Sequence, residues 1–237
     1  MHAFLSLTRH LSRIALESSA RKLPSLLPAF FLLGTAFAQF SNPAPQPSAA
    51  DKVYLRPPAG ARVAIVEFED MECPQCAHAN PLLKAASANY HAPWIRHDFP
   101  LPMHNWSHQA AINARWFDTR SKKLGDDYRD AVFADQINIE NLDGLRAFTE
   151  KFAREHGKIG LPFAIDPQGK LDDLVKADSA LGERLGINET PTIWIVTNNP
   201  ATQPVRVRDL STLYTSLDQA FAATEPASKA PATAGKH

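Results

Sequence analysis

The chain has 237 residues, of which 44% are hydrophobic and 21% are charged, a balance typical of one globular domain or of one domain with an insertion. Basic and acidic residues both number 25, so the formal net charge is zero and nothing supports a nucleic-acid binder with a broad basic surface. Two cysteines exclude a disulfide-stapled mini-scaffold and an all-cysteine zinc site, and the composition excludes collagen, a coiled coil and a polytopic membrane protein.

Residues 1–38 are typical of a secretory signal peptide. An apolar run at 23–36 precedes the small-x-small site Ala36-Phe37-Ala38, and the basic residues before the run are Arg9, Arg13, Arg21 and Lys22. The run is shorter than the roughly 20 residues that span a bilayer, although an uncleaved membrane anchor or a buried helix is the alternative. Cleavage would leave 21 basic and 24 acidic residues, a net charge of −3. We therefore expect an exported protein, periplasmic or equivalent, in a compartment where disulfides persist.

Two segments have compositions that cannot bury enough apolar surface to offset the entropy of ordering. Residues 39–51 form a Pro-rich spacer, and residues 224–237 are rich in Ala, Pro, Thr and Lys. Both are predicted to be disordered.

The folded part begins with a strand, a helix and a second strand. Residues 63–68 are a β-branched apolar run that predicts a buried central strand. A helix is expected to start at Pro74 and to reach Tyr90, with a kink at Pro81. Residues 94–99 predict the second strand, which Pro100 and Pro102 close.

Residues 105–157 carry helical patterns and few strand signals. The residues predicted to lie on the first helix are Ala110, Ala111, Ala114, Phe117 and Leu124; those on the second are Tyr128, Val132 and Phe133; those on the third are Leu145, Phe148 and Phe152. Gly157 is expected to end the third helix. We expect this helical unit to cover the side of the fold that carries the two cysteines, Cys73 and Cys76, without supplying catalytic groups.

The remaining elements are one helix, a hairpin and a closing helix. Residues 168–185 predict a helix with Leu171, Leu174, Val175 and Leu181 inward. Residues 192–197 and 205–208 predict a hairpin, and 210–221 an amphipathic helix. The order predicts an α/β fold with a helical insertion, divided into a first part at 52–104, the insertion at 105–157 and a second part at 158–223.

The motif Cys73-Pro74-Gln75-Cys76 contains both cysteines, at the point where the first strand leads into the helix. Residues three apart on a first helical turn share a face and lie within disulfide range. The helix N-terminus favours a thiolate at Cys73, which makes it the nucleophile, while the deeper Cys76 can resolve a mixed disulfide. The motif therefore predicts redox chemistry.

Two alternatives compete with the redox interpretation. A purely structural disulfide in so small a loop would constrain little of the unfolded chain. Half of a zinc site would need two more ligands, for which His104 and His108 have helical spacing. We favour the interpretation of these histidines as surface or core residues, and we expect neither a metal nor a cofactor.

The segment Glu67-Phe-Glu-Asp-Met-Glu-Cys-Pro-Gln-Cys resembles the active-site segment of DsbA-like thiol:disulfide oxidoreductases, which have a thioredoxin fold with an inserted helical subdomain. Three further features agree with this resemblance. They are the stretch from Asp98 to His104, which resembles the lead into the family's insertion; Pro81, which matches a helix-kinking proline; and 185–192, which resembles the run into a cis-proline loop. The resemblance covers roughly residues 52–223.

The resemblance implies roles for individual residues. It places Pro191 as the cis-proline and Thr190 as the residue whose backbone pairs with an extended substrate, beside Pro74 and Gln75. It also gives Glu67, six residues before Cys73, the role of a buried carboxyl that moves protons to and from Cys76. The alternative for Glu67 is a solvent-facing residue at the strand end. Trp194 is favoured as a core residue, and His78 as an exposed helix residue.

The sequence departs from the family's strong oxidants in its local charge. Gln75 stands where those oxidants have histidine, no Lys or Arg occurs in 63–83, and four acidic residues precede Cys73: Glu67, Glu69, Asp70 and Glu72. Like charge raises the pKa of a thiol. We therefore expect a Cys73 pKa of roughly 4.5 to 6.5 and a potential less oxidising than that of the strongest oxidants.

We therefore predict an exported thiol:disulfide oxidoreductase, and among its possible activities we favour that of a dithiol oxidase. The alternatives are a reductase or isomerase of the same fold, or a non-catalytic thioredoxin-like binding module, although a binding module would have no need of both sulfurs. Expected partners are thiol-bearing unfolded proteins and a membrane redox protein. We expect a monomer and no nucleic-acid partner.

Overall fold

The computed structural model describes residues 51–224. Its strands are β1 (Val63–Glu69), β2 (Trp94–Asp98), β3 (Thr192–Thr197) and β4 (Val205–Val207). Its α-helices are α1 (Pro74–Tyr90), α2 (Ser107–Asp118), α3 (Lys122–Asp135), α4 (Leu142–Glu155), α5 (Lys170–Arg184) and α6 (Leu213–Ala223), with short 3₁₀ turns at η1 (Asp51–Tyr54), η2 (Gln136–Asn138) and η3 (Leu210–Thr212). The predicted signal peptide lies outside the described residues, as do nearly all of the predicted spacer and tail.

The four strands form one mixed sheet in the order β2-β1-β3-β4. β1 pairs parallel with β2, and β3 is antiparallel to both β1 and β4. All seven residues of β1 are buried, as its apolar run predicts for a central strand. The parallel register sets Glu67 opposite Arg96 and Glu69 opposite Asp98, which places charged side chains inside the sheet.

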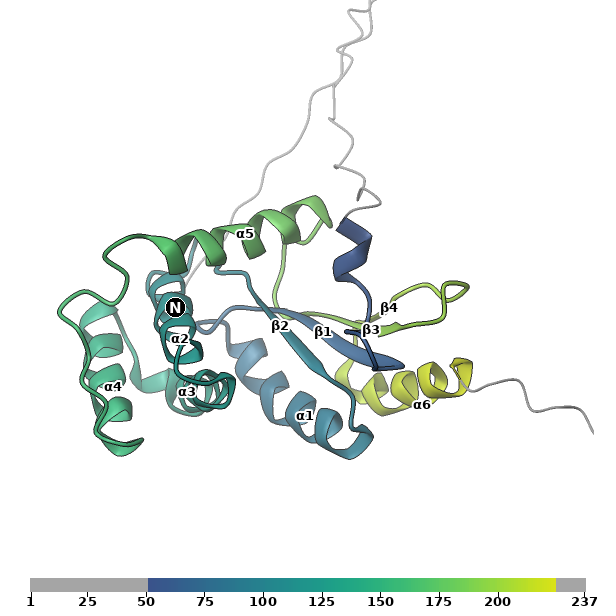
Figure 1. The fold of residues 1–237 in the computed structure, drawn as a ribbon, viewed down its shortest axis with the longest axis horizontal. Helices are drawn as coiled ribbons and strands as arrows, with labels where there is room; N and C mark the ends of the chain where they lie inside the picture. Colours follow the sequence, from purple (N-terminus) through teal and green to yellow (C-terminus); the bar gives the residue numbers. More distant parts are fainter. Residues whose placement is uncertain (1–50, 225–237) are drawn as a thin grey trace, which may run out of the picture. The chain divides into compact units, whose positions relative to one another are not determined.

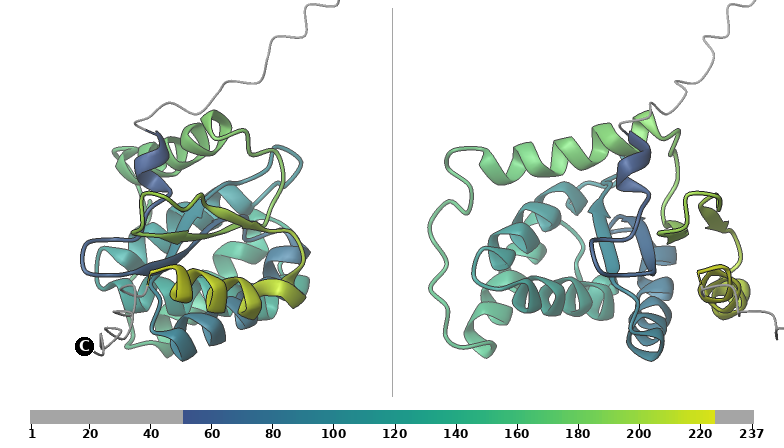
Figure 2. Two further views of the ribbon diagram at one scale, coloured as in Figure 1. Left: turned by 90° about the vertical axis from the view of Figure 1, so that its right-hand side faces the viewer. Right: turned by 45° about the vertical axis from the view of Figure 1, so that its right-hand side comes forward.

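Helices cover both faces of the sheet (Figures 1 and 2). Val63 and Ile65 pack in one cluster with α1 and α6, whereas Ala64, Val66 and Phe68 pack in another that includes Leu181 of α5. This alternation follows from the two-residue period of a strand. The predicted α/β architecture with a helical insertion is confirmed.

Helices α2, α3 and α4 build a third apolar cluster, in which Trp106, Phe117, Tyr128 and Phe152 are buried. The prediction that Leu124 belongs to the first of these helices is wrong. α2 ends at Asp118, and Ser121 starts α3 because its side chain accepts a hydrogen bond from the Leu124 backbone N–H. Three helices in this region are confirmed, and Gly157 follows α4 with φ of 112°.

Helix α5 contacts both α2 and β2. Val175 and Leu181 are buried as predicted, but the inward orientation predicted for Leu174 is wrong, since that side chain is 50% exposed. The division of the chain at residues 104 and 157 stays a prediction. No helix within residues 51–224 combines the length and the apolar character that crossing a membrane requires.

The close approach of α5 to the sheet depends on Gly182. A Cβ at this position would lie 2.5 Å from a ring carbon of Phe99 and 3.2 Å from one of Phe68. We predict that Gly182→Ala destabilises the protein by about 1–3 kcal/mol through overpacking. Urea unfolding measures this effect. Gly144→Ala in α4, where the nearest atom is 3.8 Å away, is the matched control and should stabilise by up to about 1 kcal/mol. Equal unfolding midpoints for the two variants would contradict the packing argument.

Candidate active site

The cysteine pair lies at the first turn of α1. Cys73 is the extended N-cap residue, Pro74 occupies the first turn, and the Cys73 carbonyl accepts hydrogen bonds from the backbone N–H groups of Cys76 (3.1 Å) and Ala77 (3.2 Å). Both cysteines are free thiols. Cys73 is 6% exposed and Cys76 is fully buried, so Cys73 is the more accessible sulfur, as predicted, although it is itself largely covered.

The two sulfurs have different partners. The Cys73 thiol donates to the backbone carbonyl of Thr190 at 3.3 Å, and the Thr190–Pro191 peptide bond is cis, as expected. The backbone N–H of Asp70 donates to Cys76 Sγ at 3.4 Å. The chain thus brings together two segments that lie 117 residues apart in sequence. Pro74 and Gln75 are exposed beside them, and Thr190 and Pro191 are half-buried.

The same surroundings separate the acidities of the two thiols. Hydrogen bonds from Cys76, Thr190 and the backbone of the turn lower the pKa of Cys73 to about 5, against an opposing effect of burial. This value lies in the range predicted from the sequence. Burial, with the hydrogen bond to Cys73 and the charge of Glu67, raises the pKa of Cys76 well above its usual range. Near neutral pH, Cys73 is therefore the thiolate and Cys76 the thiol.

Glu67 is buried on β1, with a side chain 1% exposed, so its solvent-facing alternative is wrong. Burial and the nearby Glu69 raise the pKa of Glu67 to about 8. Its carboxylate accepts a hydrogen bond from Trp94 Nε1 at 3.0 Å. Trp94 could not be singled out from the sequence, because its contact with Glu67 depends on the register between β1 and β2.

The other three acidic residues do not crowd the thiol as expected, because each is engaged elsewhere. Glu69 pairs with Arg96 at 2.8 Å and with Arg129 at 3.4 Å. Asp70 accepts from His104 Nδ1 at 2.7 Å and from the backbone of Leu101, and Glu72 caps α2 through the backbone N–H groups of Trp106 and Ser107. The cations that the 63–83 segment lacks are supplied by β2 and α3.

The two histidines considered as zinc ligands contact different carboxylates. His104 pairs with Asp70, whereas His108 pairs with Asp172 at 2.6 Å. Among residues 51–224, no group of three or more His, Cys, Asp or Glu side chains is placed to hold a metal ion. His78 is exposed on α1, and Trp194 packs edge-on against Phe68.

Gln136 of η2 is a site residue that sequence reasoning missed. Its Nε2 donates to the backbone carbonyls of Met71 (2.8 Å) and Cys73 (3.1 Å). The helical unit thus fixes the turn that carries the dithiol. A glutamine in a polar loop gives no sequence signal for such a contact.

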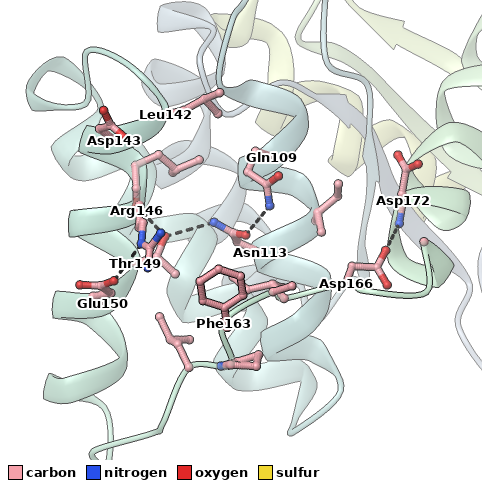
Figure 3. Close-up of a pocket in the computed structure, with 17 residues that line it drawn as sticks. Gln109, Asn113, Leu142, Asp143, Arg146, Thr149, Glu150, Phe163, Asp166 and Asp172 are labelled. Carbon is pink, nitrogen blue, oxygen red and sulfur yellow. Dashed lines mark hydrogen bonds and ion pairs between the residues drawn. The ribbon is translucent and has the colours of Figure 1, made fainter.

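A cavity of about 650 Å³ lies between α2, α4 and the segment that leads into α5 (Figure 3). Apolar side chains such as Leu142, Leu161 and Phe163 line it, and Gln109 bonds to Asn113 at 2.9 Å within it. None of the predicted site residues contributes to its lining. We therefore place the candidate chemistry at the cysteine pair.

Thr190 offers a direct test of the cause of the Cys73 acidity. Its hydroxyl is buried and has no hydrogen-bond partner while the Cys73 thiol donates to the Thr190 carbonyl. A hydrogen bond from this side chain to the ionised sulfur is among the effects that lower the pKa of Cys73. We predict that Thr190→Val raises this pKa by about one unit, since a hydrogen bond to a charged group contributes about 1.5 kcal/mol or more. Thiolate absorbance near 240 nm, followed against pH, measures the change. Thr190→Ser retains the hydroxyl and should keep a value near 5. A shift of the same size in both variants would contradict a role for the hydroxyl.

Comparisons with known proteins agree with this geometry. The model of the family described as Thioredoxin matches residues 58–213. No curated protein matches the chain. Among solved structures, Pseudomonas aeruginosa DsbA2 is 22% identical, with a TM-score of 0.52 over 69% of this chain and 91% of that one. Wolbachia pipientis alpha-DsbA1 is 16% identical, with a TM-score of 0.55 over 71% and 90%.

A periplasmic thioredoxin-like protein from Salmonella enterica serovar Typhimurium is 16% identical, with a TM-score of 0.57 over 75% of this chain and 99% of that one. These structures show the fold. The family model covers more than half of the chain. The chain therefore belongs to the thioredoxin family and has a DsbA-like thioredoxin fold.

Proposed function

We propose that this protein is a thiol:disulfide oxidoreductase that exchanges a Cys73–Cys76 disulfide with the thiols of substrate proteins, acting as a dithiol oxidase. One observation carries the proposal: a sulfur with a lowered pKa and a deeply buried sulfur with a raised pKa share the first turn of α1. A redox pair needs this division between a nucleophile or leaving group and a resolving thiol. A binding module has no use for it.

In the oxidising direction, a substrate thiolate attacks Cys73 Sγ of the disulfide. The Cys73–Cys76 bond breaks, a Cys73–substrate bond forms, and Cys76 leaves as a thiolate that takes a proton from Glu67. A second substrate thiolate then attacks the substrate sulfur, forms the substrate disulfide and releases Cys73 as a thiolate. Two electrons pass to the protein, and a membrane redox partner removes them when it reoxidises the pair.

The stability of the Cys73 thiolate supports this direction. A reduced form that is stabilised by a low pKa makes the disulfide a stronger oxidant, by about 30 mV for each pKa unit in a two-electron couple. A pKa of about 5 lies well below that of a free cysteine but above the lowest values known for activated thiols. Reductase activity, in which the Cys73 thiolate attacks a substrate disulfide and Cys76 resolves it, is the alternative of the same fold.

Export is part of the proposal. It rests on the signal-like composition of residues 1–38 and on the likeness to the Salmonella protein, whose description calls it periplasmic. In that compartment, thiol-bearing unfolded proteins are the proposed substrates. We propose that the protein acts as a monomer without a cofactor or metal, and that Pro74, Gln75, Thr190 and Pro191 contact the substrate.

Trapping tests the assignment of the two sulfurs. Cys76→Ser should accumulate mixed disulfides with reduced unfolded proteins, because the resolving thiol is absent, whereas Cys73→Ser should not. Non-reducing electrophoresis followed by mass spectrometry identifies the adducts. In the reduced wild type, alkylation near neutral pH should label Cys73 first. Adducts on Cys76 in the Cys73→Ser protein would reverse the assignment.

Substitution of Gln75 tests what sets the reduction potential of the Cys73–Cys76 pair. It is exposed between the cysteines and carries no charge, so Gln75→His should lower the pKa of Cys73 and make the pair more oxidising. Equilibration in glutathione buffers measures the potential. Gln75→Asn is the uncharged control and should leave the potential nearly unchanged, because it adds no charge at this exposed position. A wild-type potential as low as that of reducing thioredoxins, about −270 mV, would overturn the oxidase proposal in favour of a reductase.

A further inference from the structure

The Glu67 carboxyl has one hydrogen-bond donor in the described part of the chain, and that donor is the indole of Trp94. The parallel register places Arg96 opposite Glu67, yet the Arg96 guanidinium is directed elsewhere. It donates to Glu69 at 2.9 Å and to Asn80 at 3.1 Å, and it pairs with Asp130 at 3.4 Å. The cation opposite Glu67 therefore acts on it only through space.

Arg96 also holds the indole in place. Its guanidinium carbon lies 4.3 Å from the centre of the Trp94 ring, within the range of a cation–π contact. The Arg96 side chain is 3% exposed and is fixed by its contacts to β1, α1 and α3. Arg96 therefore packs on the face of the indole whose N–H donates to Glu67, and this contact favours the observed orientation of the ring.

Trp94 and Arg96 also form part of the wall of a cavity of about 600 Å³, which Lys84 of α1 and Asp130 of α3 line as well. Glu67 does not line this cavity and is 1% exposed, although its carboxyl is bonded to the indole that does. The indole thus has two effects on Glu67: it donates a hydrogen bond, and it keeps water out. These effects have opposite consequences for the acidity of the carboxyl, because a hydrogen bond and water both favour the charged form.

We propose that Trp94 is a positioning residue, whose indole N–H holds the Glu67 carboxylate in place as the base that receives the proton of Cys76. This inference rests on the proposed function and names a further residue of the same site. When a Cys73 mixed disulfide is resolved, Cys76 Sγ forms the bond to Cys73, the partner leaves as a thiolate, and the Cys76 proton passes to Glu67. An indole N–H cannot carry that proton, so Trp94 acts only through the carboxylate.

The charged groups around Glu67 set the sign of the expected change. Glu69 on β1 and the Cys73 sulfur on α1 favour its protonated form, while Arg96 and the Trp94 hydrogen bond on β2 favour the carboxylate. Removal of the N–H leaves burial, Glu69 and Cys73 opposed by Arg96 alone. The pKa of Glu67 must then rise from about 8, and less of the base is ionised at neutral pH.

The experiment replaces the N–H alone, because a smaller side chain would also admit water. Benzothienylalanine at position 94 keeps the shape of the indole and has sulfur in place of N–H. The measured quantity is the rate at which the Cys73–glutathione mixed disulfide closes to the Cys73–Cys76 disulfide, as a function of pH. The wild-type rate should rise with a midpoint near pH 8, and the variant midpoint should lie about one pH unit higher. At pH 7 the variant should then be about tenfold slower.

Two controls separate positioning from general structural damage. The same replacement at Trp194, which packs on the opposite face of the sheet, should leave the midpoint unchanged. In a Glu67→Gln background, the replacement at position 94 should cause no further change. An equal shift at positions 94 and 194, an unshifted midpoint at 94, or a shift that persists in Glu67→Gln would overturn the role of Trp94.

The same series distinguishes this inference from the proposed function. If Glu67→Gln leaves the pH profile of the wild type intact, both the proton relay and the role of Trp94 are overturned. If Glu67→Gln abolishes the step near pH 8 while the change at position 94 has no effect, only the role of Trp94 is overturned. Trapping of substrates on Cys73 tests the oxidoreductase activity independently of either result.

Discussion

The rest of the site depends on a buried pairing of one carboxylate, Glu69, with Arg96 and Arg129. All three side chains are at most 3% exposed, and they belong to β1, β2 and α3. Buried charges are costly unless they are paired, and removal of one partner from such a pair costs about 3–5 kcal/mol. This pairing therefore fixes α3 against the sheet. It also determines where Arg96 lies, and Arg96 in turn holds Trp94 over Glu67.

This pairing helps to explain how a thiolate can be stable at Cys73 although four acidic residues precede it in the sequence. Arg96 and Arg129 neutralise Glu69, while Asp70 and Glu72 are used to hold the loop after β2 and the start of α2. The pKa of Cys73 is therefore set more by hydrogen bonds to its sulfur than by repulsion from these carboxylates. Its lowered pKa means that the thiolate stabilises the reduced folded state above the pKa of the unfolded chain, near 8.5, and that this stability is lost as the pH falls towards about 5.

Sequence patterns correctly predicted the features that depend only on neighbouring residues. The apolar run of β1, the proline at the start of α1 and the spacing of the cysteines each describe a few neighbouring residues, and the structure agrees with them. Pro191 could be predicted as cis only through the family resemblance. Arg129, Trp94 and Gln136 could not be predicted, because their roles come from contacts between elements that are distant in sequence. The prediction that Leu174 points inward was wrong for a related reason. The helical period shows which face of a helix is apolar, but tertiary packing determines how much of that face is buried.

The contact between Cys73 and Thr190 links covalent chemistry to substrate binding. When Cys73 is protonated, the Thr190 carbonyl accepts a hydrogen bond from its thiol, with a sulfur-to-oxygen distance of 3.3 Å, and Cys73 is only 6% exposed. Once Cys73 ionises or enters a mixed disulfide, its sulfur has no proton to donate. The carbonyl is then free to accept a backbone N–H from an extended partner chain, which is the geometry of strand addition. In the proposed reaction, substrate pairing at Thr190 is therefore favoured when Cys73 is a thiolate or part of a disulfide, and is opposed only when Cys73 is protonated, at a pH below its pKa of about 5.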